Sequence, residues 1–71
     1  MKLAKVIGDH IKEYRLANDM AQLALAVEID IEQCNVCCWE IGKTVPTIEH
    51  LKRVADFFGI KLWEFLQEVD L

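Results

Sequence analysis

Apolar residues recur every three or four positions through most of the chain, the spacing of one face of an α-helix. In the first segment charged residues such as Asp9 and Lys12 lie off this face. Asn18 and Asp19 interrupt the pattern, and both residue types tolerate a left-handed conformation and can cap a following helix. The spacing therefore predicts a first helix that ends before Asn18. Its apolar positions are Leu3, Val6, Ile7, Ile11 and Tyr14.

Two shorter helices are predicted next, over residues 21–28 and about 32–40, with residues 29–31 as the turn between them. Nearly every residue of 21–28 is a good helix former. This segment is apolar almost all round, whereas a short surface helix normally has one apolar and one polar face. The pattern thus leaves apolar side chains without a predicted place in the core.

A fourth helix is predicted over residues 48–58. Pro46 keeps the chain extended ahead of it, Thr47 is suited to cap its N-terminus, and Gly59 is suited to end it. Its predicted buried face consists of Ile48, Leu51, Val54, Ala55 and Phe58.

A fifth helix is predicted over about residues 61–69, with Leu62, Phe65 and Leu66 on its apolar side and Trp63 expected to pack. Only 3 glycines and 1 proline interrupt the chain, which disfavours a turn-rich β-structure. The expected architecture is an all-α fold of five short helices, forming a single domain over residues 1–71.

The length of 71 residues excludes large catalytic folds, and the chain shows no Ser-His-Asp set, phosphate-binding loop or paired carboxylates in a predicted cleft. We therefore expect no enzyme, no cofactor and no small-molecule substrate. No transmembrane run and no signal-peptide pattern is present, so a cytoplasmic protein is expected.

Three cysteines, Cys34, Cys37 and Cys38, lie within five residues of one another on the third predicted helix. An odd, clustered set is not a secreted disulfide framework, so we expect free thiols. A zinc site would need a fourth ligand, for example across a dimer, and a thioredoxin-like motif needs a strand-to-helix setting. The favoured interpretation is small packing groups at a contact face, without metal.

At this level the chain resembles the phage-repressor (Cro-like or XRE) type of helix-turn-helix domain, over residues 7–66 without a gap. A Trp-Glu-x-Gly-Lys run that ends a helix, ahead of a Leu-x-x-x-Ala-x-x-x-Gly helix, is the most specific part. The residues that carry the resemblance are Ile7, Gly8, Ile11, Arg15, Gln22, Leu25, Ala26, Ile29, Ile31, Val36, Trp39, Glu40, Gly42, Lys43, Pro46, Leu51, Ala55, Phe58, Gly59, Ile60 and Leu66.

The resemblance implies that the third helix lies in the DNA major groove and that the second begins against the DNA backbone. It places base-reading positions on Gln33, Cys34 and Cys38, with Asn35 beside them. It places phosphate contacts on Gln22 and Lys43. A glutamine can pair bidentately with adenine, and an amide can donate a hydrogen bond to phosphate.

This chain departs from the family pattern on that same surface. The usual Ser or Thr cap at position 21 and Glu at 24 are both Ala, so the capping box is lost. Apolar Leu23 and Val27 replace the usual polar residues. The family's glycine turns are here Asp19 and Asp30, and cysteines replace polar positions of the recognition helix.

The distribution of charge also departs from what a DNA-binding surface requires. The whole chain carries a net charge of −4. Residues 16–42 contain no Lys or Arg but five acidic residues, which opposes contact with a polyanion. Lys43 and Arg15 are the nearest compensating cations. The departures together indicate a recognition surface repurposed by engineering or by natural divergence.

Two functions remain open on the sequence. The favoured one is a protein-binding module, whose contact patch on the second and third helices joins a partner protein or a second copy in an oligomer. The second is a sequence-specific DNA-binding transcriptional repressor that uses Gln22, Gln33, Asn35 and Lys43. The proposed contact patch consists of Leu23, Ala24, Val27, Cys34, Cys37 and Cys38.

Overall fold

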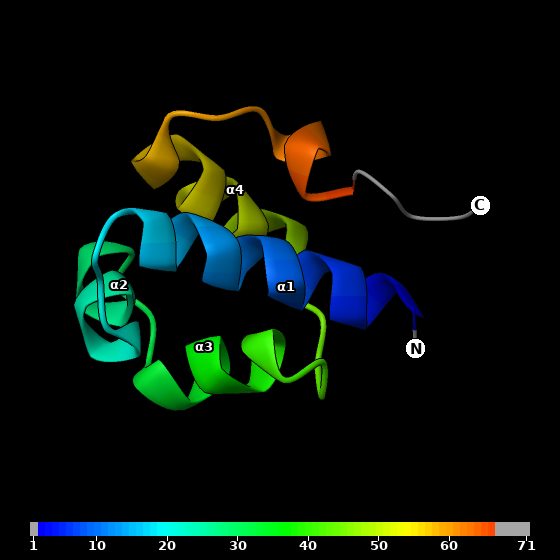
Figure 1. The fold of residues 1–71 in the computed structure, drawn as a ribbon, viewed down its shortest axis with the longest axis horizontal. Coiled ribbons are helices and arrows are strands. Elements are labelled where there is room, and N and C mark those ends of the chain that lie inside the picture. The colour runs from blue at the N-terminus through cyan, green and yellow to red at the C-terminus, as the bar shows by residue number, and fades with distance from the viewer. Residues whose placement is uncertain (1, 67–71) are drawn as a thin grey trace.

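The computed structural model describes residues 2–66, and this part of the chain contains four α-helices, one 3₁₀-helix and no β-strand. The α-helices are α1 (Lys2–Ala17), α2 (Gln22–Glu28), α3 (Gln33–Glu40) and α4 (Ile48–Phe58). In Figure 1, α3 lies on one side of α1, α4 lies on the other, and α2 sits at the end of α1 where that helix stops. Contacts join α1 and α2 to α3.

The fifth predicted helix is wrong in type. Residues Leu62–Leu66 form a 3₁₀-helix, η1, and residues 67–69 of the prediction lie outside the described residues. Phe65 alone of η1 is fully buried, and its ring meets Tyr14 edge-on with the ring centroids 5.6 Å apart. The contact between the rings of Phe65 and Tyr14 therefore holds η1 against α1.

The core is built largely from the apolar stripes that the sequence predicts. It draws on α1, α2, α3, α4 and η1, so each element places at least one side chain in it. Three predicted apolar positions are wrong: Ile48 is 70% exposed, Trp63 is 58% exposed and Leu66 is 44% exposed. Ile48 is the first residue of α4, and Trp63 and Leu66 belong to a helix of five residues. At these places helical periodicity does not determine a buried face. The buried apolar residues are Ala4, Ile7, Ile11, Leu25, Ala26, Ile29, Val36, Trp39, Leu51, Val54, Ala55 and Phe65.

Capping differs between α4 and the two helices before it. Thr47 accepts a hydrogen bond from the His50 backbone N–H at 3.2 Å, and Gly59 adopts a left-handed φ of 71°, as predicted. Ala21 and Glu32 occupy the cap positions of α2 and α3 and make no side-chain cap hydrogen bond. The first turns of α2 and α3 thus depend on the packing of the helices for their stability.

A close crossing of α1 and α3 brings the two helix backbones together at Gly8. A Cβ atom added there would overlap the carbonyl oxygen of Trp39 and lie 3.2 Å from the Cα of Glu40. The absence of a side chain at Gly8 is therefore what allows α3 to pack directly on α1.

Candidate nucleic-acid interface

The turn between α2 and α3 reverses the chain within a few residues. The backbone N–H of Ile31 donates to the Ala26 carbonyl at 2.9 Å, and Asp30 adopts a left-handed φ of 57°. Asp19, in the preceding turn, has a φ of 55°. Both positions are therefore aspartate, where the helix-turn-helix resemblance predicts glycine. The short polar side chain of aspartate tolerates this left-handed conformation.

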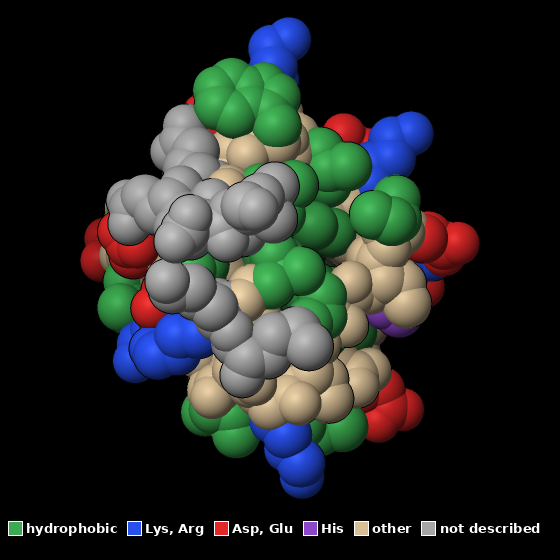
Figure 2. Space-filling model, turned by 90° about the vertical axis from the view of Figure 1, so that its right-hand side faces the viewer, with side chains coloured by type: hydrophobic (Ala, Val, Ile, Leu, Met, Phe, Trp, Pro, Cys, Tyr) green, Lys and Arg blue, Asp and Glu red, His purple; other side chains and the backbone are tan. Residues whose placement is uncertain are grey.

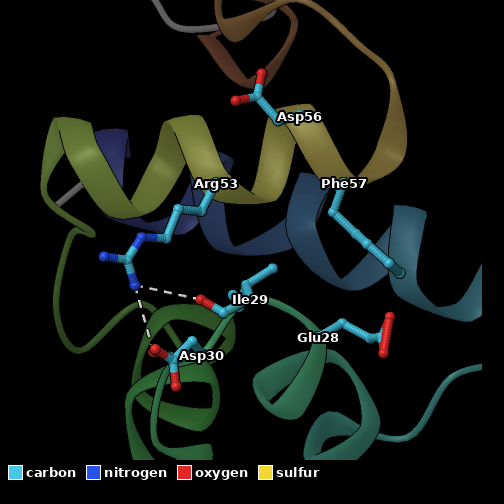
Figure 3. A pocket seen from close by; sticks show the side chains of 6 residues that line it. All are labelled: Glu28, Ile29, Asp30, Arg53, Asp56 and Phe57. Atoms are coloured by element: carbon cyan, nitrogen blue, oxygen red, sulfur yellow. Dashed lines mark hydrogen bonds between the residues drawn. The ribbon is translucent and has the colours of Figure 1, made fainter.

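Arg53 of α4 holds this turn from outside (Figure 3). Its Nη1 atom donates to the carbonyl oxygens of Ile29 and Asp30, each at 3.3 Å, and its Nη2 atom donates to Glu49 at 2.8 Å. A guanidinium satisfies the carbonyls that the end of α2 leaves free. Sequence reasoning missed Arg53, because the carbonyls that it contacts in the turn belong to residues more than twenty positions away.

A buried ion pair joins the C-terminal ends of α1 and α3. Arg15 of α1 donates from Nε and Nη2 to the two carboxylate oxygens of Glu40 in α3, at 2.7 and 2.9 Å. A third donor of Arg15 reaches the Met20 carbonyl at 2.7 Å. The hydrogen bonds to Glu40 raise the pKa of the Arg15 guanidinium above its ordinary value, although burial acts in the opposite direction.

The ion pair removes both charges from the surface. Arg15 and Glu40 are 8% and 6% exposed, so Arg15 is unavailable to phosphate and Glu40 does not repel it. The expectation that Arg15 compensates for acidic charge is therefore wrong. A sequence signal exists for both: each lies four residues after a buried apolar residue, Ile11 or Val36, on the core-facing side of its helix.

Gln22, one of the predicted phosphate contacts, is partly committed to this network. Its Nε2 atom donates to Glu40 at 3.1 Å, and its side chain is half-buried. Lys43 is exposed in the loop after α3, and its side chain is open to solvent. The two predicted phosphate contacts therefore differ in how freely they can reach a ligand.

The first turn of α3 faces solvent. Gln33, Cys34 and Asn35 are all exposed, while Val36 and Trp39 are buried in the core. The amides of Gln33 and Asn35 each offer a donor and an acceptor. This turn can form hydrogen bonds with an external surface without any change in the packing of the helix.

The predicted apolar contact patch divides into two parts. Leu23, Ala24 and Val27 are exposed on α2 and line one hollow, together with Met20, Ala21 and Glu28. Leu23 is 56% exposed and Val27 is 69% exposed. The cysteines do not line this hollow. Cys34 is exposed on α3, and Cys37 and Cys38 are half-buried there.

Charge around the interface is sparse and mostly acidic. With Glu40 buried, the acidic residues that stay exposed within 16–42 are Asp19, Glu28, Asp30 and Glu32. At the end of the molecule away from α2, where α1 begins, Figure 2 shows Lys and Arg side chains that project separately at the edges and form no continuous basic surface. Within the described residues, no group of three or more His, Cys, Asp or Glu side chains is arranged to hold a metal ion. Crossing a membrane would require a longer and more apolar helix than any these residues form.

The four α-helices of the described residues are compatible with a helix-turn-helix arrangement, and one similar protein is itself described as a regulator of that type. The chain is similar to an HTH-type transcriptional activator, BcrR of Enterococcus faecalis, with 27% identity over 64 residues. The matched region covers 90% of this chain and 31% of the activator, so the chain spans less than a third of the relative's length. No protein-family model and no solved structure matches the chain.

Proposed function

We propose that this chain is a DNA-binding helix-turn-helix module of a transcription regulator. The main observation behind the proposal is that the first turn of α3 is exposed. The amide side chains of Gln33 and Asn35 face solvent there, while the next residue, Val36, is buried in the core. The similarity to a transcriptional activator over nearly the whole chain supports the same function. It favours DNA binding over the protein-binding function that the sequence alone ranked first.

The chemistry of the turn favours base reading over phosphate attraction. Glutamine and asparagine can each donate and accept in one plane, which matches the N6 and N7 atoms of adenine. Lys43 supplies a charge for the DNA backbone at the other end of α3. With so few cations nearby, we expect one copy to bind DNA weakly and with a shallow dependence on salt.

Substitutions at the two ends of α3 test the proposal. Gln33→Ala should change base preference at one position and cost about 1–3 kcal/mol on the preferred site, because a bidentate contact is lost. Lys43→Ala should weaken binding to all sequences alike and reduce the salt slope by about 1, because one phosphate contact is lost. Selection from a random duplex library, followed by fluorescence anisotropy at several salt concentrations, measures both.

Lys61→Ala is the matched control, since Lys61 is exposed next to η1, which contacts α1 and α4. It should leave affinity and salt slope unchanged. Equal losses for Lys43→Ala and Lys61→Ala, or an unchanged preference in Gln33→Ala, would contradict the proposal.

A protein-binding surface on α2 is the second candidate function, and the exposed apolar hollow at Leu23 and Val27 favours it. An exposed apolar surface of this kind is typical of a partner site for another protein or for a second copy. Neither function requires an enzyme activity or a cofactor.

Val27→Lys tests this second function. The substitution should abolish self-association or partner binding while the helical circular-dichroism spectrum stays unchanged, because Val27 is 69% exposed and does not belong to the core cluster. Ile48→Lys is the control, as Ile48 is equally exposed but lies on α4. Sedimentation at low and high salt measures the effect. Identical behaviour of the two variants would rule out the α2 surface.

A further inference from the structure

α3 carries free thiols at positions one helical turn apart. Cys34 is exposed and Cys38 is half-buried, and neither forms a disulfide. In an α-helix, positions four residues apart are offset by about 40° around the axis, against about 60° for positions three apart such as Cys34 and Cys37. The Cβ atoms of residues four apart are separated by about 5–6 Å. The thiols of Cys34 and Cys38 therefore lie on the same strip of the helix surface.

This separation disfavours a disulfide and suits a bridging atom. A disulfide brings two Cβ atoms to about 3.5–4.5 Å, so closing one between Cys34 and Cys38 would distort α3. A soft atom bonded to both sulfurs, at about 2.3 Å as in zinc–thiolate sites, keeps the sulfurs further apart and matches the helical spacing. Thiolates are also the ligands that soft ions prefer.

We propose that Cys34 and Cys38 form a dithiol site for a soft, thiol-seeking ligand of the trivalent arsenical class. Such a ligand needs only two thiolates. The site therefore needs no third protein ligand, and the described residues contain no group of three that could hold a metal ion. With phenylarsine oxide, two sulfur–arsenic bonds form. The arsenic-bound oxygen leaves as water with the two thiol protons, and nothing is oxidised or reduced.

A regulatory consequence follows, and this part rests on the proposed DNA-binding function. Cys34 lies between Gln33 and Asn35, the two exposed amides of the first turn of α3. A bulky group that bridges Cys34 and Cys38 covers this strip of α3. The arsenical and DNA therefore compete for the same surface.

Intact-mass spectrometry of the reduced protein with phenylarsine oxide tests the site without DNA. We expect one adduct per chain that survives excess glutathione, a monothiol, and is removed by dithiothreitol, a dithiol. Cys34→Ser and Cys38→Ser should each lose this adduct, and Cys37→Ser, the matched control, should keep it. No adduct, an adduct displaced by glutathione, or dependence on Cys37 in place of Cys38 would overturn the proposal.

The regulatory part is tested by anisotropy with the selected duplex. The arsenical should lower the DNA affinity of the unmodified protein about tenfold or more, the scale of a lost base contact. Cys38→Ser, compared with its own untreated affinity, should show no such loss. An unchanged affinity of the adduct overturns the regulatory part. Failure of the untreated protein to bind any duplex overturns the proposed function, while the mass measurement still decides the dithiol site.

Discussion

Glu40→Gln should destabilise the fold by about 3–5 kcal/mol, because it leaves the Arg15 guanidinium buried without its charged partner. That is a large part of the roughly 5–15 kcal/mol that holds a small domain together. Urea unfolding followed by circular dichroism measures the loss. Asp9→Asn is the matched control: it breaks the exposed Lys5–Asp9 pair, at 2.8 Å, and should cost less than about 1 kcal/mol.

A double variant separates the loss of a partner from the loss of packing. Replacing both charges, as Arg15→Met with Glu40→Leu, should recover most of the stability, because no uncompensated charge remains in the interior. If Glu40→Gln costs no more than Asp9→Asn, the pair is not the buried contact described above. If the double variant is less stable than Glu40→Gln alone, the charge argument is wrong.

Gly8→Ala should cost about 3 kcal/mol, since the added methyl group overlaps backbone atoms of Trp39 that cannot move without shifting α3. The better helix propensity of alanine returns about 1 kcal/mol at most. Thermal and urea unfolding measure the net change. Retained stability in Gly8→Ala would show that α1 and α3 are further apart than described.

Gly59→Ala provides the comparison for Gly8→Ala. No atom lies within 4 Å of a Cβ built at Gly59, but its φ is 71°. The cost there should be about 1–2 kcal/mol and should come from the backbone conformation alone. Gly8→Ala should also weaken DNA binding in whatever fraction stays folded, because it moves α3, whereas Gly59→Ala should not.

Residue types and their spacing predicted the helices well where a segment is long or has capping residues. The bounds of α4, its Thr47 cap and its Gly59 terminus follow from residue types at fixed positions, and all three are confirmed. η1 is too short for periodicity to distinguish an α-helix from a 3₁₀-helix, so its type and the exposure of Trp63 were predicted wrongly.

The candidate site was less predictable, because its geometry depends on contacts between distant parts of the sequence. The exposure of Gln33 and Asn35 follows from the position of Val36 on the core side of α3. Gln22 donates to Glu40, 18 positions away, and Arg53 donates to the carbonyl of Ile29, 24 positions away. No local sequence pattern predicts contacts over such separations. The sequence therefore supplied the residues of the surface but not the network behind it.

The buried pair of Arg15 and Glu40 also restricts how this chain can change over generations. A lineage that loses either charge alone passes through a form with much of its stability gone, whereas one that exchanges both at once does not. The two positions, 25 residues apart, are thus expected to change together, and related chains should carry both charges or neither. A chain that keeps one of them would need a new partner for it from another helix.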